Sequence, residues 1–289
     1  MSDIYKRVSS RLEIDWYPYH KEILFTQNDV CVHFQWFDPE LRQAVSKKLY
    51  HDYKERKPPI LELNGRGYRV LDTEVEEMDW QHADKTATVD LLLPFDLQQY
   101  VKFFPKSVIV IAGVSNAGKT AFLYNFILMN MHKHIITLYN SETSPEQMND
   151  RLSGFDMEIP NPAPFRTIDR YDNFADVIDP DGISVVDYVD NDVEVYNNGL
   201  EISRMFHKLR RGVVFAALQK KKLEELGYGG NPTLKRAALY LSMNPNKLKI
   251  VKGKSWKDPT VNPNGMMWNF KLINGARFCQ IERDYENET

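Results

Sequence analysis

The residues best suited to do chemistry form the segment Gly113 to Thr120, which reads Gly-Val-Ser-Asn-Ala-Gly-Lys-Thr and has the spacing GxxxxGKT. Glycines let the chain turn so that successive backbone N–H groups converge on phosphate oxygens. The residues expected to bind a nucleoside triphosphate are Gly113, Val114, Ser115, Asn116, Ala117, Gly118, Lys119 and Thr120. Lys119 is the expected catalytic cation between the β and γ phosphates, and Thr120 is the expected hydroxyl ligand of Mg²⁺.

The neighbouring segments are those that such a loop requires. Residues 108–112 are an apolar, β-branched run, typical of a parallel strand that is buried on both faces. Residues 121–128 form an apolar stretch of helical length. A helix that begins at the loop directs its positive end at bound phosphate. The order strand, loop, helix therefore predicts a P-loop.

Three polar residues stand at or just after the ends of later apolar runs of strand length. They are Glu142, Asp187 and Gln219. Because the carboxyl ends of parallel strands meet at one edge of a sheet, we expect all three beside the P-loop. Asp187 is the expected carboxylate in the water shell of Mg²⁺. Asp190, three residues later, is expected to be a loop acid.

Together these motifs resemble the DnaB-like branch of the RecA-like ATPases. The resemblance covers residues 93–282 and includes the turn and helix from Asn140 to Leu152 and the pair Asp187-Tyr188. It implies an α/β fold, a RecA-like P-loop core with a central, mainly parallel sheet. It also implies hydrolysis of ATP with Mg²⁺ between the subunits of a homo-oligomer, with a hexamer as one candidate.

The resemblance assigns roles to two of the polar residues. Glu142 takes the place of the family's catalytic glutamate, which orients and deprotonates the attacking water. Gln219 takes the place of the polar residue that contacts the γ phosphate and relays its presence to the next loop. An alternative for Glu142 is the first turn of a helix capped by Ser141 or Thr143, where a carboxylate is favoured in any case.

Lysines occupy two further positions of interest. The family places a lysine and then an arginine where this chain has Lys252 and Lys254, and both reach the γ phosphate held by the neighbouring subunit; lysine lacks the planar fork of arginine. The loop after the fourth strand opens with Lys220, Lys221 and Lys222, followed by glycines that we expect to be mobile. The resemblance places this loop at a ring channel that holds single-stranded DNA. A solvated charge run is the alternative.

The last segments also follow the family. Residues 234–241 are expected to be a helix and residues 247–254 a strand. Residues 265–278 are expected to form a hairpin, with Asn274-Gly275 at its turn.

Residues 1–72 resemble a winged helix-turn-helix. Asp38 followed by Pro39 predicts the start of a helix that runs to about Arg56, and residues 27–36 are expected to form an earlier one. A glycine turn between residues 60–63 and 68–71 predicts a hairpin. The residues expected to contact duplex DNA are Arg42, Lys47, Lys48, Arg66 and Arg69. Such domains also bind proteins, and twelve bases here are nearly matched by eleven acids.

Composition limits the class of protein. The 289 residues are 43% apolar and 27% charged, with two cysteines, no signal peptide and no apolar run long enough to span a membrane, so we expect a cytoplasmic protein. Charge is segregated: residues 140–201 carry a net −12 and residues 204–257 a net +12. The basic segment can bind a polyanion, unless the two segments interleave and neutralise each other.

The expected organisation is a winged-helix-like domain at residues 1–72, an acidic linker at 73–92 and an ATPase domain at 93–289. The predicted function is that of a DNA-dependent ATPase that acts as a helicase, a translocase or an accessory factor in replication or recombination. An alternative is a regulatory or defence protein in which ATP switches assembly on DNA or a protein partner with little turnover. A small-molecule kinase is disfavoured because no arginine-rich lid is evident.

Overall fold

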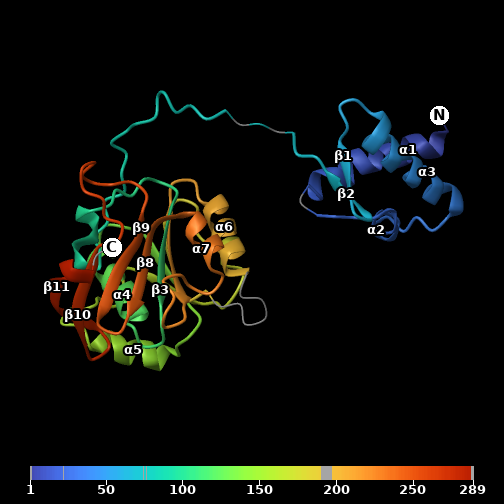
Figure 1. Cartoon of the computed structure of the whole chain (residues 1–289). Coiled ribbons are helices and arrows are strands. Elements are labelled where there is room, and N and C mark those ends of the chain that lie inside the picture. Colours follow the sequence, from blue (N-terminus) through green and yellow to red (C-terminus); the bar gives the residue numbers. More distant parts are fainter. Residues whose placement is uncertain (1, 22, 74, 76, 190–196, 288–289) are drawn as a thin grey trace. The chain divides into compact units, whose positions relative to one another are not determined.

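The computed structural model describes residues 2–21, 23–73, 75, 77–189 and 197–287 (Figure 1). The chain divides into two compact units, residues 1–83 and residues 84–289, and each is described by itself. Asp190 lies outside the described residues. Within them, every helix is too short or too polar to cross a lipid bilayer.

The first unit contains three helices and a hairpin. The elements are α1 (Asp3–Arg11), α2 (Gln27–His33), α3 (Pro39–Tyr50), β1 (Leu61–Asn64) and β2 (Gly67–Val70). A π-helical turn, His51–Glu55, extends α3 to the end expected from the sequence, and Asp38 caps its start by accepting a hydrogen bond from the N–H of Glu40. The prediction of α3 and of the hairpin is thus confirmed.

Two features of the first unit differ from the expectation. Helix α2 ends at His33, three residues early, and α1 was not predicted. The sequence does contain the apolar periodicity of this first helix. Apolar residues recur there every four positions and all pack in the core of this unit: Ile4, Val8, Leu12 and Trp16.

The second unit is built on one nine-stranded sheet in the order β11-β10-β9-β8-β3-β7-β6-β4-β5. Six strands are parallel: β3 (Ser107–Gly113), β4 (Ile136–Asn140), β5 (Arg166–Asp169), β6 (Ile183–Asp187), β7 (Val213–Gln219) and β8 (Ala237–Asn244). The remaining three extend the sheet in antiparallel fashion: β9 (Lys247–Gly253), β10 (Met267–Ile273) and β11 (Arg277–Arg283). The unit is therefore an α/β fold with a large, mainly parallel central sheet.

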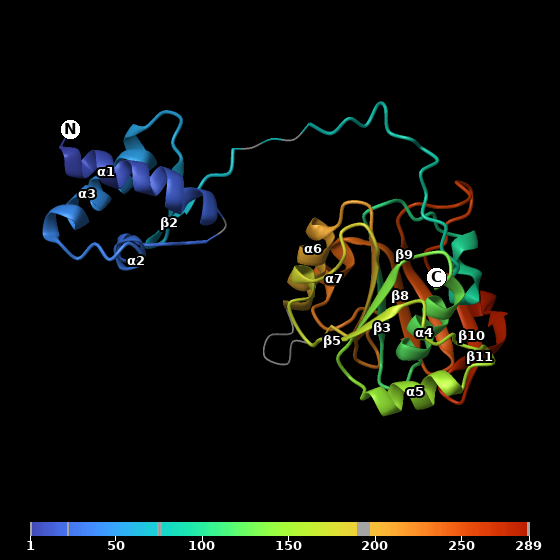
Figure 2. The same cartoon turned by 180° about the vertical axis from the view of Figure 1, so that it is seen from behind.

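Helices cover both faces of this sheet (Figures 1 and 2). They are α4 (Lys119–Asn130), α5 (Pro145–Ser153), α6 (Asn197–Lys208) and α7 (Asn231–Lys235). Along β3, Ile109 and Ile111 pack with the side chains of α4, while Val108 and Val110 pack with those of α6. Both faces of β3 are buried, which explains its unbroken apolar sequence.

The prediction of a helix at residues 234–241 is wrong. Only the short α7 precedes residue 236, and the chain then forms β8, which lies between β3 and β9. Because β8 is buried on both faces, Leu239, Tyr240 and Leu241 form a continuous apolar run that does not alternate and can be mistaken for a buried helix. Strand β5 was also not predicted.

The last residues of the range expected as a linker pack against the second unit. The N–H of Val89 donates to the carbonyl of Phe103 at 2.7 Å, and the N–H of Leu92 donates to Asn130 Oδ1 at 3.0 Å. Leu91 between them is buried. The domain limits drawn from the sequence stay predictions.

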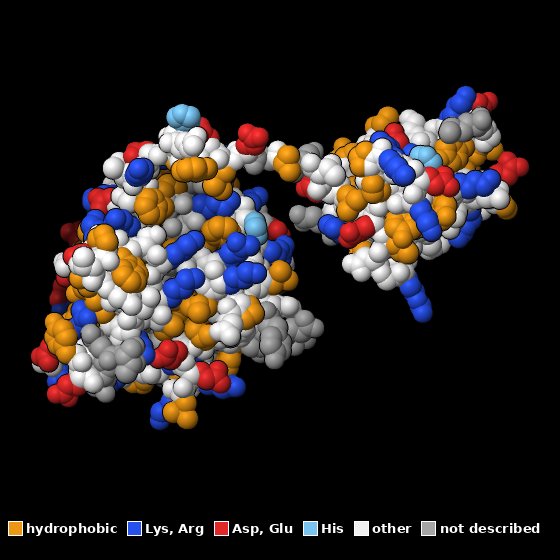
Figure 3. Space-filling view, turned by 45° about the horizontal axis from the view of Figure 1, so that its top comes forward, with side chains coloured by type: hydrophobic (Ala, Val, Ile, Leu, Met, Phe, Trp, Pro, Cys, Tyr) orange, Lys and Arg blue, Asp and Glu red, His pale blue; other side chains and the backbone are white. Residues whose placement is uncertain are grey.

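The acidic and basic segments neutralise each other only in part. Arg204 pairs with Asp176 and Glu201, and Arg210 pairs with Asp181. Other Lys and Arg side chains remain gathered on one face of the second unit (Figure 3).

Candidate nucleotide site

The order of the parallel strands creates the position of the site. Strand β3 lies between β7 and β8, and the chain leaves β3 to form β4 three strands away, beyond β7 and β6. Ligands of open α/β sheets bind at such a switch point, outside the carboxyl ends of the strands. Gly113 is paired with Gln219 across β3 and β7, and Asp187 ends β6 next to them. The structure thus brings three predicted site positions to one edge.

The P-loop has the backbone conformation that its sequence demands. Asn116 and Gly118 have positive φ angles of 59° and 97°, and Gly118 caps the start of α4. A Cβ atom at Gly113 would lie 2.8 Å from Lys119 Cγ, so that only glycine leaves room for the lysine side chain. The free N–H groups at the start of α4 are the expected phosphate donors.

The Lys119 side chain is held by hydrogen bonds to the P-loop backbone and to the end of β7. Its Nζ donates to the carbonyls of Gly113 and Val114, at 3.2 and 3.1 Å, and to Gln219 Oε1 at 2.9 Å. Burial lowers the pKa of Lys119, and the carboxylates of Asp187 and Glu142 oppose that change. The direct contact between Lys119 and Gln219 could not be read from the sequence, which separates them by one hundred residues.

Asp187 is a buried acid without a protein partner. Its side chain is buried, and neither oxygen has a hydrogen-bond partner among the described residues. Burial raises the pKa of Asp187 to about 6, although the nearby Thr120 hydroxyl partly opposes this without reaching hydrogen-bond geometry. An orphaned carboxylate beside a hydroxyl suits a hydrated cation that is also held by phosphate oxygens.

The described residues contain no cluster of three or more His, Cys, Asp or Glu side chains that could hold a metal ion by themselves. Mg²⁺ in nucleotide sites characteristically takes one or two protein ligands together with substrate phosphates and water. Thr120 and Asp187 fit that donor set.

Glu142 lies in a turn before α5, not within the helix. The helix is capped by Ser144, which accepts a hydrogen bond from the N–H of Gln147, so the alternative of a first-turn carboxylate capped by Ser141 or Thr143 is wrong. The Asn140 side chain organises the turn by accepting hydrogen bonds from the N–H and hydroxyl of Thr143, at 3.2 and 3.0 Å. The exposed Glu142 carboxylate is thereby presented at the same edge as the P-loop.

A pocket of about 460 Å³ joins the P-loop, Glu142 and Gln219, whereas the buried Asp187 is not one of its lining residues. The predicted residues that line it are Ser115, Asn116, Gly118, Lys119, Thr120, Glu142 and Gln219. The sequence analysis did not foresee the lining residues Arg151, Tyr188, Tyr228, Leu272, Asn274 and Gly275. Arg151, on α5, has no carboxylate partner for its guanidinium among the described residues, which makes it a second cation available to an anionic ligand.

The carboxyl-terminal hairpin forms one wall of the pocket. Asn274 and Gly275 have positive φ angles of 54° and 64°, and they make the predicted turn between β10 and β11. Asn125 of α4 fastens this turn by donating from Nδ2 to the carbonyl of Ala276 at 2.8 Å. The turn was readable from the sequence, but this contact spans 151 positions and was not.

The lysine loop after β7 differs from the expectation in two respects. Lys220 is buried, and its Nζ donates to the carbonyl of Glu224 and to Asn244 Oδ1, so its assignment to DNA is corrected. Two of the glycines expected to be mobile are hydrogen-bonded: the N–H of Gly227 donates to Tyr240 Oη at 2.8 Å, and that of Gly230 donates to the carbonyl of Gly227 at 2.9 Å. Lys221 and Lys222 are exposed.

Lys252 and Lys254 lie far from the P-loop within the unit. Gly253 between them pairs with Leu239 near the start of β8, whereas the P-loop follows the ends of the parallel strands. Lys252 Nζ donates to the carbonyl of Leu234 at 2.9 Å, and Lys254 is exposed. These lysines are therefore placed away from the nucleotide pocket of their own chain.

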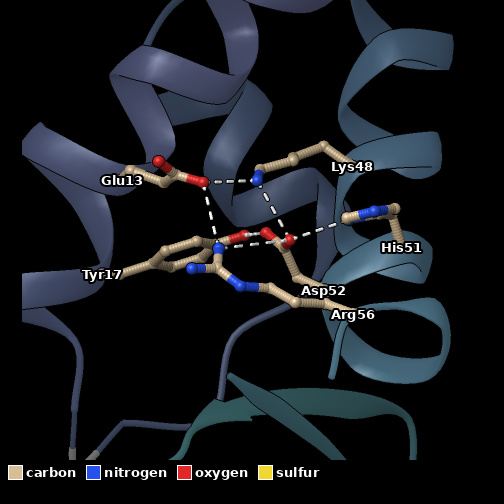
Figure 4. A network of polar contacts seen from close by, with 6 residues as sticks. All are labelled: Glu13, Tyr17, Lys48, His51, Asp52 and Arg56. Carbon is tan, nitrogen blue, oxygen red and sulfur yellow. Dashed lines mark hydrogen bonds and ion pairs between the residues drawn. The ribbon is translucent and has the colours of Figure 1, made fainter. Parts of the chain in front are cut away.

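One predicted DNA contact in the first unit is a core residue. Lys48 is only 3% exposed, and its Nζ contacts Glu13 Oε1 at 2.6 Å and Asp52 Oδ1 at 3.0 Å (Figure 4). The fully buried Asp52 also accepts a hydrogen bond at Oδ2 from the Tyr17 hydroxyl at 2.8 Å, and its Oδ1 lies 3.1 Å from His51 Nδ1 and 3.9 Å from Arg56 Nη1. The assignment of Lys48 to DNA is corrected, because its charge already serves Asp52.

Of the other four predicted DNA contacts in the first unit, two form hydrogen bonds within the protein. Arg69 Nε donates to Glu62 Oε1 at 2.7 Å, and Arg42 Nη2 donates to Asn28 Oδ1 at 3.4 Å. Lys47 and Arg66 are exposed.

Comparison with known proteins yields similarity to solved structures only. No protein-family model matches the chain, and no curated protein matches it. Among solved structures, the chain is similar to the crystal structure of the RadB recombinase, with 14% sequence identity and a TM-score of 0.43. The match covers 61% of this chain and 91% of the RadB chain. This similarity is too low to assign a family.

Proposed function

We propose that the second unit is a RecA/DnaB-like ATPase domain that hydrolyses ATP with Mg²⁺ and acts on DNA. The observation that supports this most directly is the convergence at one edge of the P-loop lysine, Gln219, an exposed glutamate and an orphaned buried aspartate. A phosphate cradle without the other three residues would serve many enzymes.

The proposed chemistry divides among four side chains. Lys119 binds the β and γ phosphates and leaves its present hydrogen bond to Gln219, which is then free to contact the γ phosphate. Glu142 accepts a proton from the water whose oxygen forms the new bond to the γ phosphorus. The bond from that phosphorus to the β–γ bridging oxygen breaks, and ADP leaves. Arg151 is placed to neutralise charge at the terminal phosphate.

Mg²⁺ would be held by the Thr120 hydroxyl, by phosphate oxygens and through water by Asp187, and it would neutralise charge on the phosphates. This arrangement would give Asp187 the partner that the described protein atoms do not provide.

The proposal extends to assembly and to DNA. Lys254 is exposed and far from its own pocket, which suits a trans-acting role in a homo-oligomeric ring, whereas Lys252 would have to leave its hydrogen bond to Leu234. Lys221 and Lys222 are exposed and follow shortly after Gln219, the last residue of β7. They are the proposed contacts of single-stranded DNA in the ring channel. A helicase, a translocase and a replication or recombination factor all use such a site.

The test is ATP turnover with and without single- and double-stranded DNA, coupled to measurement of molecular mass in the presence of ATP. We expect single-stranded DNA to stimulate turnover of an oligomer, and Lys119→Ala to abolish it. A monomer whose turnover ignores DNA would overturn the ring and DNA parts of the proposal.

A second candidate function concerns the first unit. Its three helices and two-stranded hairpin, with an isolated antiparallel bridge between Phe25 and Tyr68, support a winged-helix fold. Its surface favours a protein partner over DNA, because Lys48 is buried and large apolar side chains are exposed, such as Tyr19 at 75% and Phe37 at 63%. ATP-dependent assembly with negligible turnover would favour the regulatory or defence role.

A further inference from the structure

A second basic region of the ATPase unit lies at the edge of the sheet opposite the nucleotide pocket. Lys106 immediately precedes β3, Arg236 immediately precedes β8, and Lys254 directly follows β9, which is antiparallel to β8. These residues therefore stand at the amino-terminal edge of the parallel strands. The P-loop stands at the carboxyl edge.

Six of the cations at this amino-terminal edge are called the edge patch below: Lys106, Lys208, Lys235, Arg236, Lys252 and Lys254. Figure 3 shows Lys and Arg side chains gathered on a face of this unit. In the part of the chain that the structure describes, none of the six forms an ion pair with a carboxylate. Three neighbouring acids, Asp176, Glu201 and Asp181, are paired with Arg204 and Arg210. A fourth, Asp179, accepts a hydrogen bond from the N–H of Asp181 at 2.9 Å.

An aromatic ring holds the centre of the patch together. Lys106 Nζ lies 5.2 Å from the centroid of the Phe206 ring, and Arg236 Cζ lies 5.0 Å from it. Arg236 Nη2 is 3.3 Å from His207 Nε2, and Arg236 Nε is buried with no hydrogen-bond partner among the described residues. Cation–π contacts thus substitute for carboxylates and leave the positive charge uncompensated.

The remaining lysines add to the same local field. Lys252 and Lys254 are two residues apart on one strand, and the pKa of Lys252 is lowered by burial and further by the charge of Lys254. Packing like charges together is unfavourable unless an anion binds there.

The composition of the patch distinguishes between partners. Lysine is depleted in protein–protein interfaces, whereas distributed lysines and arginines without acids are typical of surfaces that neutralise a row of backbone phosphates. We propose that the edge patch binds the phosphate backbone of a nucleic acid. The proposal rests on the proposed action on DNA but names a different surface from the loop that carries Lys221 and Lys222.

The experiment uses the full chain and a fluorescent 30-nucleotide oligo-dT or a 30-base-pair duplex, with anisotropy measured without ATP at several salt concentrations. The patch variant is Lys106→Ala, Lys208→Ala and Lys235→Ala together. The control variant, Lys85→Ala, Lys249→Ala and Lys271→Ala, removes the same charge away from the amino-terminal edge, since Lys249 pairs with Ser242 toward the carboxyl end of β8. Lys252 and Lys254 stay intact, so that a trans-acting role does not confuse the result. A fluorescent ATP analogue checks that each variant is folded.

Each phosphate contact contributes about 0.7 to the slope of log K against log salt for a single strand. For the patch variant, we expect the magnitude of that slope to be smaller by about 2 than for the parent chain. At 0.1 M salt the variant should bind oligo-dT about a hundredfold more weakly. The control variant should bind like the parent chain, and the ATP analogue should bind all three proteins equally.

Equal oligonucleotide binding by the patch and control variants would overturn the proposal, as would loss of binding only in a Lys221→Ala, Lys222→Ala variant. So would a patch variant that keeps oligonucleotide binding but no longer assembles with ATP, because the patch would then face a second copy of the chain. A chain that binds neither oligonucleotide yet hydrolyses ATP would refute the edge patch and leave the ATPase proposal standing.

Discussion

Asp187 and Lys48 are both buried charged residues, but their surroundings differ in kind. Lys48 and Asp52 satisfy each other within hydrogen-bond distance, which makes them part of the fold. Asp187 has no such partner, and its raised pKa records an unfavourable burial of charge. A buried acid whose charge is offset only in part, here by Thr120 and Lys119, is typical of a binding or catalytic site.

Replacing Asp187 with asparagine should therefore separate stability from function. Asp187→Asn removes the partly offset charge and should raise the free energy of unfolding of the nucleotide-free chain by on the order of 1–3 kcal/mol. The same change should impair turnover of Mg-ATP, which steady-state kinetics would show. Asp169→Asn, at the exposed end of β5, is the matched control and should change neither quantity. A destabilised Asp187→Asn protein with normal turnover would contradict the assigned role.

Lys47 and Lys48 form a natural test pair in the first unit. Lys48→Ala leaves the buried Asp52 carboxylate with only the longer contact to Arg56, 3.9 Å, and the contact to His51, and should destabilise this unit by about 3 kcal/mol. Lys47→Ala changes an exposed side chain and should lie within about 0.5 kcal/mol of the parent protein. Hydrogen exchange in peptides of residues 1–72 would measure both, and equal protection in the two variants would be inconsistent with the buried network.

At the scale of elements, the site depends on short segments between strand and helix. The P-loop and the three polar strand ends were predictable, because glycine spacing and unbroken apolar runs are local signals. Strand β8 was mistaken for a helix because its burial between two strands removes the alternation that marks most strands. The sequence predicted that Arg151 lies in a helix, but not that it lines the pocket, because its place there depends on how α5 packs.

The cap of α5 should influence catalysis through the turn that carries Glu142. Ser144→Ala removes the side-chain oxygen that accepts from the Gln147 N–H, which should cost about 1 kcal/mol of stability and lower turnover by loosening the preceding turn. Thr26→Ala removes the comparable cap of α2 in the first unit. It should cost a similar free energy while ATP turnover stays unchanged. Kinetics and thermal unfolding of the two variants would check this, and equal turnover would exclude a positioning role for the cap.

At the scale of the whole chain, the two units carry different surfaces for the proposed functions. The second unit has the pocket lined by the P-loop at the carboxyl edge of its parallel strands and the edge patch at the amino edge. The first unit exposes apolar side chains and keeps one of its predicted DNA-binding lysines in its core. Contacts such as Lys119 with Gln219 and Asn125 with Ala276 join distant parts of the sequence, so the shape of the pocket could not be derived from local patterns.

The central claim is that the pocket cleaves ATP with Glu142 as the base, and single-turnover hydrolysis by Glu142→Gln tests it most directly. Glutamine keeps the size of the side chain but cannot accept the proton, so phosphate release should slow about 10²–10⁴-fold while ATP still binds. Glu146→Gln, an exposed residue in the first turn of α5, is the matched control and should hydrolyse ATP at the parent rate. Unchanged phosphate release by Glu142→Gln would contradict the account.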